Sequence, residues 1–367
     1  MADVTALLNP RIQDREGLTE FIEDLSDLVP NIERDIARLR RAPDDNAIVA
    51  NLFRAMHNIK GDASICKVEV GTIIAHPIET LLSRLRSSEI AFSDLLAEVI
   101  LLAMDRLELA VDAISTGKPL GHLHLIELVG GLEGMALADG SRLDELSVQL
   151  IEAVTGFRPV RAGSQVRPAA APSGRGGEGF AGDLKFFRSL ALQLEARSAL
   201  FKGRSGRLMR LALDTNAVAG KPVDPSQLEA AVYMHDVGMM FLPESVWLKV
   251  GRLSDEEKKS MHTHPAYAAA LLERMDGWKP AAEMVAQHHE MPDGGGYPEG
   301  RKADTICDGA KILAIVDAFE AVTLKHSHRG QSRSMVRAIA EINACDNQFA
   351  PEWIGHFNTV IRRMVEA

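Results

Sequence analysis

An all-α protein with more than one domain is predicted by three features of the sequence. Aromatic residues make up only 5% of the 367 residues, and runs of β-branched residues are short. Long stretches rich in Ala, Leu, Glu and Arg repeat their apolar residues at helical spacing. An apolar fraction of 46% in a chain of this length is sufficient for two or three hydrophobic cores.

The first predicted domain is a helical bundle over residues 1–120. From about Asp14 to Gly117 the sequence alternates amphipathic segments with polar breaks, as bundle helices do. Within this range, Asp44 or Asp45 can cap a helix. Five apolar residues at helical spacing form the stripe that this helix is expected to bury: Ile48, Leu52, Met56, Ile59 and Ala63.

His57 lies just off that stripe. It is expected to face solvent together with Lys60 and Gly61, because residues three and four apart share a helix face. These residue types suit a histidine that accepts a phosphoryl group. Such a side chain must be exposed, Lys60 can offset the added negative charge, and a glycine leaves room for a docking partner. The plainer alternative is that His57 is an ordinary surface histidine.

Three further segments complete the predicted organisation. Residues 121–157 predict a helical extension that either enlarges the bundle or mediates formation of a homodimer. In residues 158–182, Pro, Gly, Ser and Ala replace periodic apolar residues, which predicts a flexible linker. As a random coil, this linker would span roughly 25–30 Å on average and let its flanking domains move independently. Residues 183–367 form the second predicted helical domain.

Charge and cysteine usage limit the partners and the compartment. With 41 basic against 51 acidic residues, the chain has a net charge of -10, which argues against broad binding of DNA or of anionic membranes. Cys66, Cys307 and Cys345 form no CxxC pair and are expected to be reduced thiols, so a cytoplasmic location is predicted. The largely apolar segment Leu95–Met104, bounded by Asp94 and Asp105, is too short to span a membrane.

The second half of the chain contains six potential metal ligands in four separate segments: His235, Asp236, His264, His288, His289 and Asp317. Histidine binds transition metals as the neutral imidazole, and mixed imidazole and carboxylate sets suit such ions. Each piece also has a plainer explanation, since an isolated His-Asp pair is near chance and His264 beside Pro265 could cap a helix. A carboxylate in the apolar segment around Asp317, however, needs a partner.

The stretch LFRAMHNIKGDAS, followed by AHPIETLLSRLR, resembles the histidine phosphotransfer (HPt) family over about residues 14–117. The resemblance implies that His57 accepts a phosphoryl group, with Lys60 beside it. It also implies that Glu79 on the following helix hydrogen-bonds the imidazole and orients its other nitrogen for attack. No ATP-binding kinase motif is present in the sequence, so the implied partner is the histidine kinase or the receiver domain of another protein.

Four segments of the second half resemble the HD-GYP family of metal phosphohydrolases, over essentially all of residues 183–367. They are HDVG at residues 235–238, the KVGRLSDEEKKSM stretch that leads to His264, HHEMPDGGGYPEG at residues 288–300, and AKILAIVDAFEAV around Asp317. The resemblance implies that the domain hydrolyses cyclic di-GMP to linear pGpG, or to GMP after a second cut.

The same resemblance implies two divalent transition-metal ions, and the ligand types do not choose among Fe, Mn, Ni and Zn. Asp236 would bridge the two ions at the catalytic centre, and two ions of this kind lower the pKa of a shared water and clamp a phosphate. One ion would also be held by His235 and Asp317. The other would be held by three histidines: His264, His288 and His289.

Substrate contacts are implied in two places. The resemblance implies that Gly294, Gly296, Tyr297 and Pro298 shape the pocket over the nucleotide. Basic groups that face the phosphates in the family are absent here, so either Lys325, Arg329 or Arg204 substitutes for them or the affinity for cyclic di-GMP is reduced. Together, the two resemblances predict a two-component signalling protein in which phosphorylation of His57 regulates a phosphodiesterase.

The sequence departs from the HD-GYP pattern at Leu200, Arg204, Met239, His326 and His328. Arg204 stands where the family has a metal-binding histidine. A cation there would repel the first ion and could replace it with a salt bridge to Asp317 or Asp236. The competing prediction is therefore a catalytically degenerate module that binds a protein partner or a nucleotide without hydrolysis. A third prediction keeps hydrolysis but changes the substrate to another phosphoester.

Overall fold

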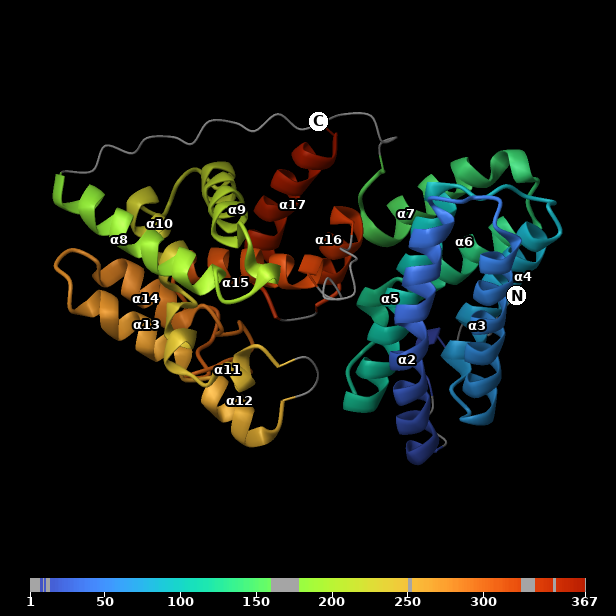
Figure 1. The fold of residues 1–367 in the computed structure, drawn as a ribbon, viewed down its shortest axis with the longest axis horizontal. Coiled ribbons are helices and arrows are strands. Elements are labelled where there is room, and N and C mark those ends of the chain that lie inside the picture. The colour runs from blue at the N-terminus through green and yellow to red at the C-terminus, as the bar shows by residue number, and fades with distance from the viewer. Residues whose placement is uncertain are drawn as a thin grey trace. The chain divides into compact units, whose positions relative to one another are not determined.

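The computed structural model describes nearly the whole chain, in the ranges 7–8, 10, 14–159, 178–249, 253–324, 334–345 and 348–366. Within these ranges every regular element is a helix (Figure 1), so the all-α prediction is confirmed. The chain divides into two compact units. The first unit comprises residues 1–161 and 329–344, and the second comprises residues 162–328 and 345–367.

The first unit is a helical bundle. In it α2 packs against α3 and α5, α3 packs against α4, α4 contacts α6, and α7 packs against α5 and α6. Its helices are α2 (Arg15–Leu39), α3 (Asn46–Ile65), α4 (Glu69–Arg86), α5 (Asp94–Thr116), α6 (Leu125–Leu137), α7 (Leu143–Thr155) and α16 (Met335–Asn343), with the short 3-10 helices η1 (Gly121–Leu123) and η2 (Gly140–Arg142).

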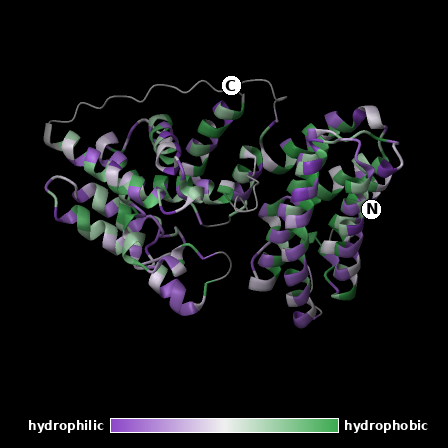
Figure 2. Cartoon of the chain, viewed as in Figure 1, coloured by the Kyte–Doolittle hydropathy of each residue, from purple (hydrophilic) through white to green (hydrophobic). Residues whose placement is uncertain are grey.

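Helix α3 shows why these segments are helical. The Asp45 carboxylate caps its first turn by accepting the N–H groups of Ala47 and Ile48 at 3.0 and 3.2 Å. The five residues of the predicted apolar stripe are all buried, and burial of a large apolar side chain contributes about 1.5–3 kcal/mol. Figure 2 shows that most helices carry both hydrophobic and hydrophilic residues. In α3, His57 lies off the buried stripe and is exposed.

Helix α16 is a late segment of the chain that completes the first unit. It packs against α5 and α7. The buried Arg337 guanidinium donates two hydrogen bonds to Asp105, at 2.7 and 2.8 Å, and one to Glu33 at 3.2 Å. Arg106 of α5 donates to the carbonyl oxygen of Ala340 at 3.2 Å. The sequence assignment of residues 183–367 to a single domain did not anticipate this placement.

The second unit is also entirely helical where it is described. Helix α10 packs against α8, α9 and α14, and α15 packs against α9, α14 and α17. The elements are α8 (Glu178–Glu195), η3 (Ala199–Phe201), α9 (Arg204–Val218), α10 (Pro225–Met234), η4 (Val237–Phe241), α11 (Glu244–Trp247), α12 (Asp255–Met261), α13 (His264–Glu273), α14 (Lys279–Gln287), α15 (Asp308–Leu324) and α17 (Pro351–Glu366).

An aromatic cluster fixes α8 within the second unit. The buried Trp278 ring contacts Phe180 and Phe187 at centroid distances of 4.8 and 5.1 Å, and its indole N–H donates to Asp183 at 2.8 Å. Helix α8 begins at Glu178, which lies inside the range predicted as linker. Most of that predicted linker, residues 160–177, lies outside the described residues.

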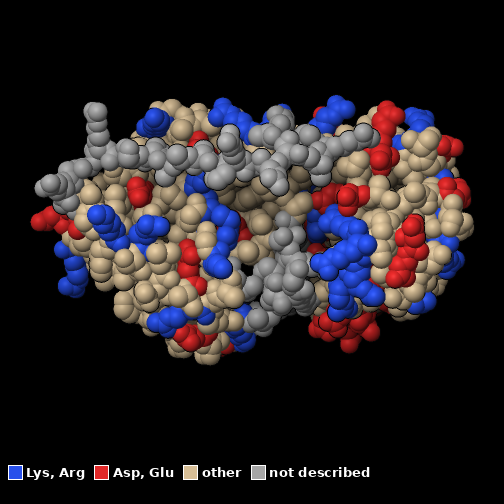
Figure 3. Space-filling view, turned by 45° about the horizontal axis from the view of Figure 1, so that its top comes forward, with Lys and Arg blue, Asp and Glu red and all other residues tan. Residues whose placement is uncertain are grey.

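The surface carries charges of both signs. Acidic and basic side chains occur on both units in the view of Figure 3. Among the described residues, no helix combines the length and the apolar character needed to cross a membrane.

Candidate functional site

Residues from four segments of the second unit converge into two adjoining groups of metal-ligand type. Asp236 belongs to both groups. One group joins it with His235 and Asp317, and the other joins it with His264, His288 and His289, with the ligand atoms of each group within 4.8 Å of one another. Helix ends place three of these side chains: His235 is the C-cap residue of α10, His264 begins α13, and His288 is the C-cap residue of α14. Asp317 lies within α15.

Three of the histidines are oriented in the same way. Nδ1 of each lies against the backbone carbonyl oxygen three residues earlier, at 2.8 Å for His235, 2.7 Å for His264 and 2.7 Å for His288. A carbonyl oxygen only accepts, so Nδ1 must carry a proton, and in the neutral ring Nε2 is then the lone-pair nitrogen. Fixing the tautomer through Nδ1 is the arrangement that metal-binding histidines use.

The group of Asp236, His264, His288 and His289 fits a cation. Nε2 of His264 faces Nε2 of His288 at 3.4 Å. The Asp236 Oδ1 atom lies 3.4 Å from Nε2 of His264 and 4.0 Å from Nε2 of His288, and this buried oxygen has no hydrogen-bond partner among the described residues. Lone-pair nitrogens and an anionic oxygen that converge without a proton donor between them are a suitable set for a transition metal.

Electrostatics keep these three histidines in the ligand form. Burial lowers the pKa of His264, His288 and His289, in the last case to about 4. Burial opposes ionisation of Asp236, but the neighbouring His235 and Arg204 outweigh it and hold the pKa of this carboxyl well below its ordinary value. At neutral pH the group thus has three neutral imidazoles and one carboxylate.

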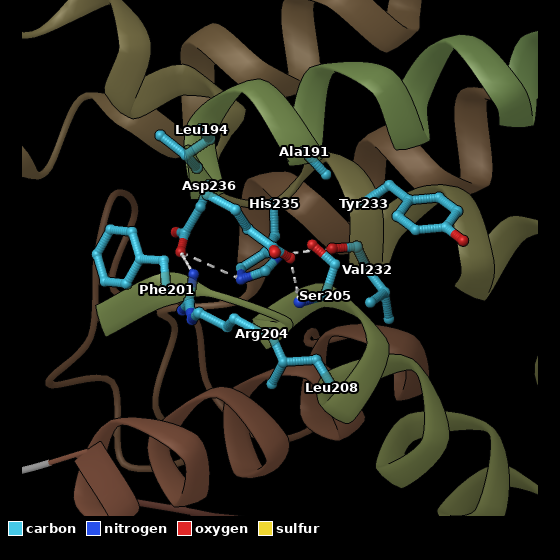
Figure 4. Close-up of a pocket in the computed structure, with 11 residues that line it drawn as sticks. Ala191, Leu194, Phe201, Arg204, Ser205, Leu208, Val232, Tyr233, His235 and Asp236 are labelled. Carbon is cyan, nitrogen blue, oxygen red and sulfur yellow. Dashed lines mark hydrogen bonds and ion pairs between the residues drawn. The ribbon is translucent and has the colours of Figure 1, made fainter. Parts of the chain in front are cut away.

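The other group, His235 with Asp236 and Asp317, already contains a cation. The Arg204 guanidinium forms an ion pair with Asp236 through Nη1 (Figure 4). Its Nη2 atom forms a second ion pair with Asp317. The His235 Nε2 atom lies 3.3 Å from Asp236 and 3.7 Å from Asp317. Burial lowers the pKa of His235, but the two carboxylates outweigh it and raise the pKa to about 9. The two carboxylates are therefore already paired with positively charged protein groups.

The start of α9 holds Arg204 in this place. Arg204 is the first residue of the helix, and the Glu195 carboxylate accepts the N–H groups of Gly203 and Ser205 at 2.8 and 2.7 Å. Beside the guanidinium lies a cavity (Figure 4), lined by Ala191, Leu194, Glu195, Phe201, Arg204, Ser205, Leu208, Val232, Tyr233, His235 and Asp236.

Close backbone packing explains why the last residue of the HDVG motif, Gly238, is glycine. A Cβ atom at this position would collide with the backbone carbonyl group of His264. The glycine therefore permits the backbone of η4 to approach the start of α13 closely. This approach brings Asp236, two residues before Gly238, within reach of the His264 imidazole.

The loop after His289 covers one side of the histidines. The Tyr297 ring stacks on His262 at a centroid distance of 3.8 Å and on His289 at 4.7 Å. His262 belongs to neither ligand group. A Cβ atom at Gly296 would collide with the backbone of residues 289–291, and Gly294 has a φ of 86°. The loop backbone therefore requires glycine at both positions: close packing requires it at Gly296, and the positive φ favours it at Gly294.

In the first unit, His57 and Lys60 both contact the carboxylate of Glu79. Nδ1 of His57 lies 2.7 Å from Oε1 of Glu79, and Lys60 pairs with the other oxygen of the same carboxylate. The His57 side chain is 63% exposed, whereas that of Glu79 is 11% exposed. Burial opposes ionisation of Glu79, but the hydrogen bonds from Lys60 and His57 hold its pKa below the ordinary value. The carboxylate thus orients the ring and leaves Nε2 on its outer side.

Comparison with family models covers both units. Residues 16–117 match the Hpt domain, and residues 189–352 match the HD domain. The chain thus contains an Hpt domain and an HD domain. The two resemblances predicted from the motifs are thereby confirmed.

Several known proteins are similar to parts of this chain. It is 32% identical over 147 residues to 3'3'-cGAMP-specific phosphodiesterase 2 of Vibrio cholerae serotype O1, covering 38% of this chain and 28% of that protein. It is 33% identical over 119 residues to the cyclic di-GMP phosphodiesterase response regulator RpfG of Xanthomonas campestris pv. campestris, covering 32% and 31%. The HD domain of the L. monocytogenes phosphodiesterase PgpH aligns with a TM-score of 0.36 at 13% identity, over 48% of this chain and 97% of that one. The chain spans less than a third of the length of these two curated relatives.

In the Hpt domain, Gly61 has no packing reason to be glycine. A Cβ atom at this position would meet nothing within 4 Å. A glycine in a helix interior lowers helix stability relative to alanine. The open space one turn after His57 is therefore consistent with the predicted room for a docking partner.

In the HD domain, some predicted residues cannot be placed and one unpredicted residue matters. Lys325, His326 and Arg329 lie outside the described residues, as does the side chain of Leu200. Glu290 is buried, and its carboxylate accepts the N–H groups of Glu299 and Arg301 at 2.7 and 2.8 Å, which closes the loop that carries Tyr297 and Pro298. The sequence signal for this role is the glutamate that directly follows the two histidines, as the third residue of the HHE string.

Proposed function

We propose that the HD domain is a metal-dependent phosphodiesterase for a cyclic dinucleotide, with cyclic di-GMP as the substrate, and that phosphorylation of His57 regulates it. The observation that carries this proposal is the convergence of Asp236 Oδ1 with the oriented imidazoles of His264 and His288. The naming of the relatives as cyclic di-GMP and cGAMP phosphodiesterases supports the substrate class. The cytoplasmic location and the homodimer stay predictions.

The side chains around the proposed centre have distinct tasks. A transition-metal ion bound by Asp236, His264, His288 and His289 would supply a Lewis acid for a phosphoryl oxygen and lower the pKa of water. The backbone carbonyl oxygens at Nδ1 keep the imidazoles turned toward that centre. The Tyr297 ring, stacked on His289, shields one side from bulk water. Hydrolysis of one phosphodiester bond would give linear pGpG.

The direct test is turnover by the full chain. The protein is loaded separately with Mn, Fe, Ni or Zn and incubated with cyclic di-GMP or 3'3'-cGAMP, and linear products are separated by chromatography. Asp236→Ala, which removes the carboxylate shared by both groups, is expected to abolish turnover. Absence of product with every metal, with His57 phosphorylated and unphosphorylated, would overturn the enzymatic proposal.

Arg204 favours one second candidate, a degenerate module that binds a cyclic dinucleotide without cleaving it. Its guanidinium neutralises both Asp236 and Asp317. Calorimetric binding of cyclic di-GMP together with full recovery of the intact nucleotide would select this candidate over the phosphodiesterase.

The regulatory part of the proposal is supported by the path of the chain. Helix α16 belongs to the first unit, yet in sequence it lies between α15, which carries Asp317, and α17, which packs against α9 and thus against the helix of Arg204. The chain passes between the units at three points. We propose that a change in the Hpt domain reaches the HD domain through the connections of α16.

Arg337 provides the test of this route. The full chain is phosphorylated on His57 with phosphoramidate, and the ratio of hydrolysis rates with and without phosphate is measured. Arg337→Gln weakens the attachment of α16 and is expected to bring this ratio to about unity, because loss of one partner of a buried ion pair costs about 3–5 kcal/mol. Arg38→Gln, which breaks an exposed pair with Asp35, is the control. An unchanged ratio in the folded Arg337 variant would exclude α16 as the route.

A further inference from the structure

The two ligand groups of the HD domain share Asp236 but use different oxygens of its carboxylate. Arg204 pairs with Oδ2, which also faces His235. Oδ1 faces His264 and His288. The carboxylate is therefore divided between a protein cation on one side and a set of imidazole nitrogens on the other.

Arg204 cannot serve as a metal ligand in the place of a histidine. A guanidinium has five N–H donors and no acceptor, and it stays charged at any pH that a folded protein survives. It also occupies the two carboxylate oxygens that an ion in the group of His235 would need, Asp236 Oδ2 and Asp317 Oδ1. A divalent ion there would have to displace these contacts and would meet the guanidinium charge at close range.

The guanidinium is also fixed in position. The Arg204 side chain is only 13% exposed. The helix start that carries it is bound on both sides by Glu195, through the N–H groups of Gly203 and Ser205. The Phe201 ring lies 5.5 Å from the guanidinium carbon. Two ion pairs, a bound backbone and an aromatic neighbour thus hold the guanidinium between the two carboxylates.

We infer that this HD domain holds a single divalent ion, in the group of Asp236, His264, His288 and His289, and that the Arg204 guanidinium takes the place of a second cation between Asp236 and Asp317. The inference rests on the proposed metal dependence of the domain, but it concerns the number of ions and the residue that sets it. Arg204 is in these terms a positioning residue: it holds the shared carboxylate so that Oδ1 remains available.

Metal counting on the full chain tests the inference without reference to activity. Purified protein is saturated with Mn(II), passed through a desalting column and analysed by mass spectrometry for bound metal. The wild-type chain is expected to retain about one ion per chain. Its low-temperature electron paramagnetic resonance spectrum is expected to be that of isolated Mn(II), without the signal of an exchange-coupled pair. Retention of about two ions, or a coupled signal, would overturn the inference.

Arg204→His converts the guanidinium into a ligand and frees both carboxylates. This variant is expected to retain about two ions and to show the coupled signal. The matched control is Arg207→His on the same helix, whose pair with Glu320 lies outside both ligand groups, and it is expected to remain at about one ion. If folded Arg204→His stays at about one, Arg204 is not the residue that sets the number, and the assignment falls.

Arg204→Lys guards against a folding defect in the histidine variant. Lysine retains the positive charge and has no lone pair while protonated, so this variant is expected to stay at about one ion, and retention of two would contradict the inference. The outcomes also separate the inference from the proposed function. If the wild-type chain retains one ion but shows no turnover, the proposed phosphodiesterase activity is wrong and the single-ion inference stands. If it retains two ions and shows turnover, the activity stands and the single-ion inference is wrong.

Discussion

Histidines in the two units differ in what binds their Nδ1 atom and in how far they are exposed. His57 of the Hpt domain has a carboxylate at Nδ1 and a side chain that is 63% exposed. His264 and His288 of the HD domain have a backbone carbonyl oxygen at Nδ1 and are buried. The same ring is thus prepared for two kinds of chemistry.

The difference lies in what each environment does to the free nitrogen. A charged partner such as Glu79 raises the basicity of the opposite nitrogen, and exposure lets a phosphoryl donor reach it, which suits a nucleophile. A neutral carbonyl partner only fixes the tautomer, and burial among other imidazoles keeps the ring neutral, which suits a metal ligand.

The largest expected effect is on metal binding after loss of one buried imidazole. We expect His288→Ala to weaken Mn(II) binding by more than about 100-fold, since loss of an outer-shell partner alone costs roughly 10–100-fold. Titration calorimetry measures it. His262→Ala is the matched control, because His262 stacks on Tyr297 but belongs to neither ligand group. Equal losses in the two variants would break the distinction between ligand and neighbour.

The second prediction concerns the metal-free protein at acidic pH. Burial lowers the pKa of His289 from 6.5 to about 4. Between these values the unfolded chain binds a proton that the folded protein does not, so the free energy of unfolding falls as the pH falls. The loss from this residue is about 3 kcal/mol at the lower end of the window. The free energy of unfolding in urea, measured between pH 6.5 and about 4, is expected to depend less steeply on pH in His289→Gln than in the wild-type chain. An equal slope in the two proteins would refute the lowered pKa of His289.

Loss of the Glu79 charge tests the nucleophile. Glu79→Gln is expected to slow phosphorylation of His57 by phosphoramidate about 100-fold, because the carboxylate no longer stabilises the developing positive charge on the ring. Phosphorus nuclear magnetic resonance of the wild-type chain should place the phosphate on Nε2. Glu69→Gln, an exposed glutamate of the same helix, is the control. Phosphate on Nδ1 would contradict the orientation seen in the structure.

The smallest effect separates docking space from packing. Gly61→Ala has room for its Cβ atom and is expected to raise the free energy of unfolding by about 1 kcal/mol. Gly71→Ala would place a Cβ atom 2.7 Å from that of Ala63 and 2.8 Å from the Phe21 ring, and is expected to cost about 1–3 kcal/mol. Thermal unfolding compares the two variants. Destabilisation by Gly61→Ala would mean that this glycine serves the fold.

Much of the fold and of the ligand set could be predicted because short-range patterns determine them. The stripe of α3 and its Asp45 cap follow from helical spacing, and the histidines lie in strings that resemble a known family. The fold of the second unit then brings these residues together into the two ligand groups. The roles of the individual site residues stay predictions that the experiments above address.

Other features could not be read because they depend on partners distant in sequence. The sequence left open whether Arg204 pairs with Asp236 or Asp317, and the structure pairs it with both. A proline such as Pro77 can kink or end a helix, yet α4 continues through it and Glu79 reaches His57. The assignment of α16 required knowledge of the buried charges that Arg337 meets, which lie on helices far earlier in the chain.

The position of α16 also bears on the order in which the protein is made. When the ribosome has finished α7 at Thr155, Asp105 and Glu33 have been synthesised, but the arginine that neutralises them, Arg337, lies 182 residues further along the chain. Docking of α16 onto the first unit thus waits for translation of most of the second unit. Neither half of the gene, expressed separately, would encode a complete first unit.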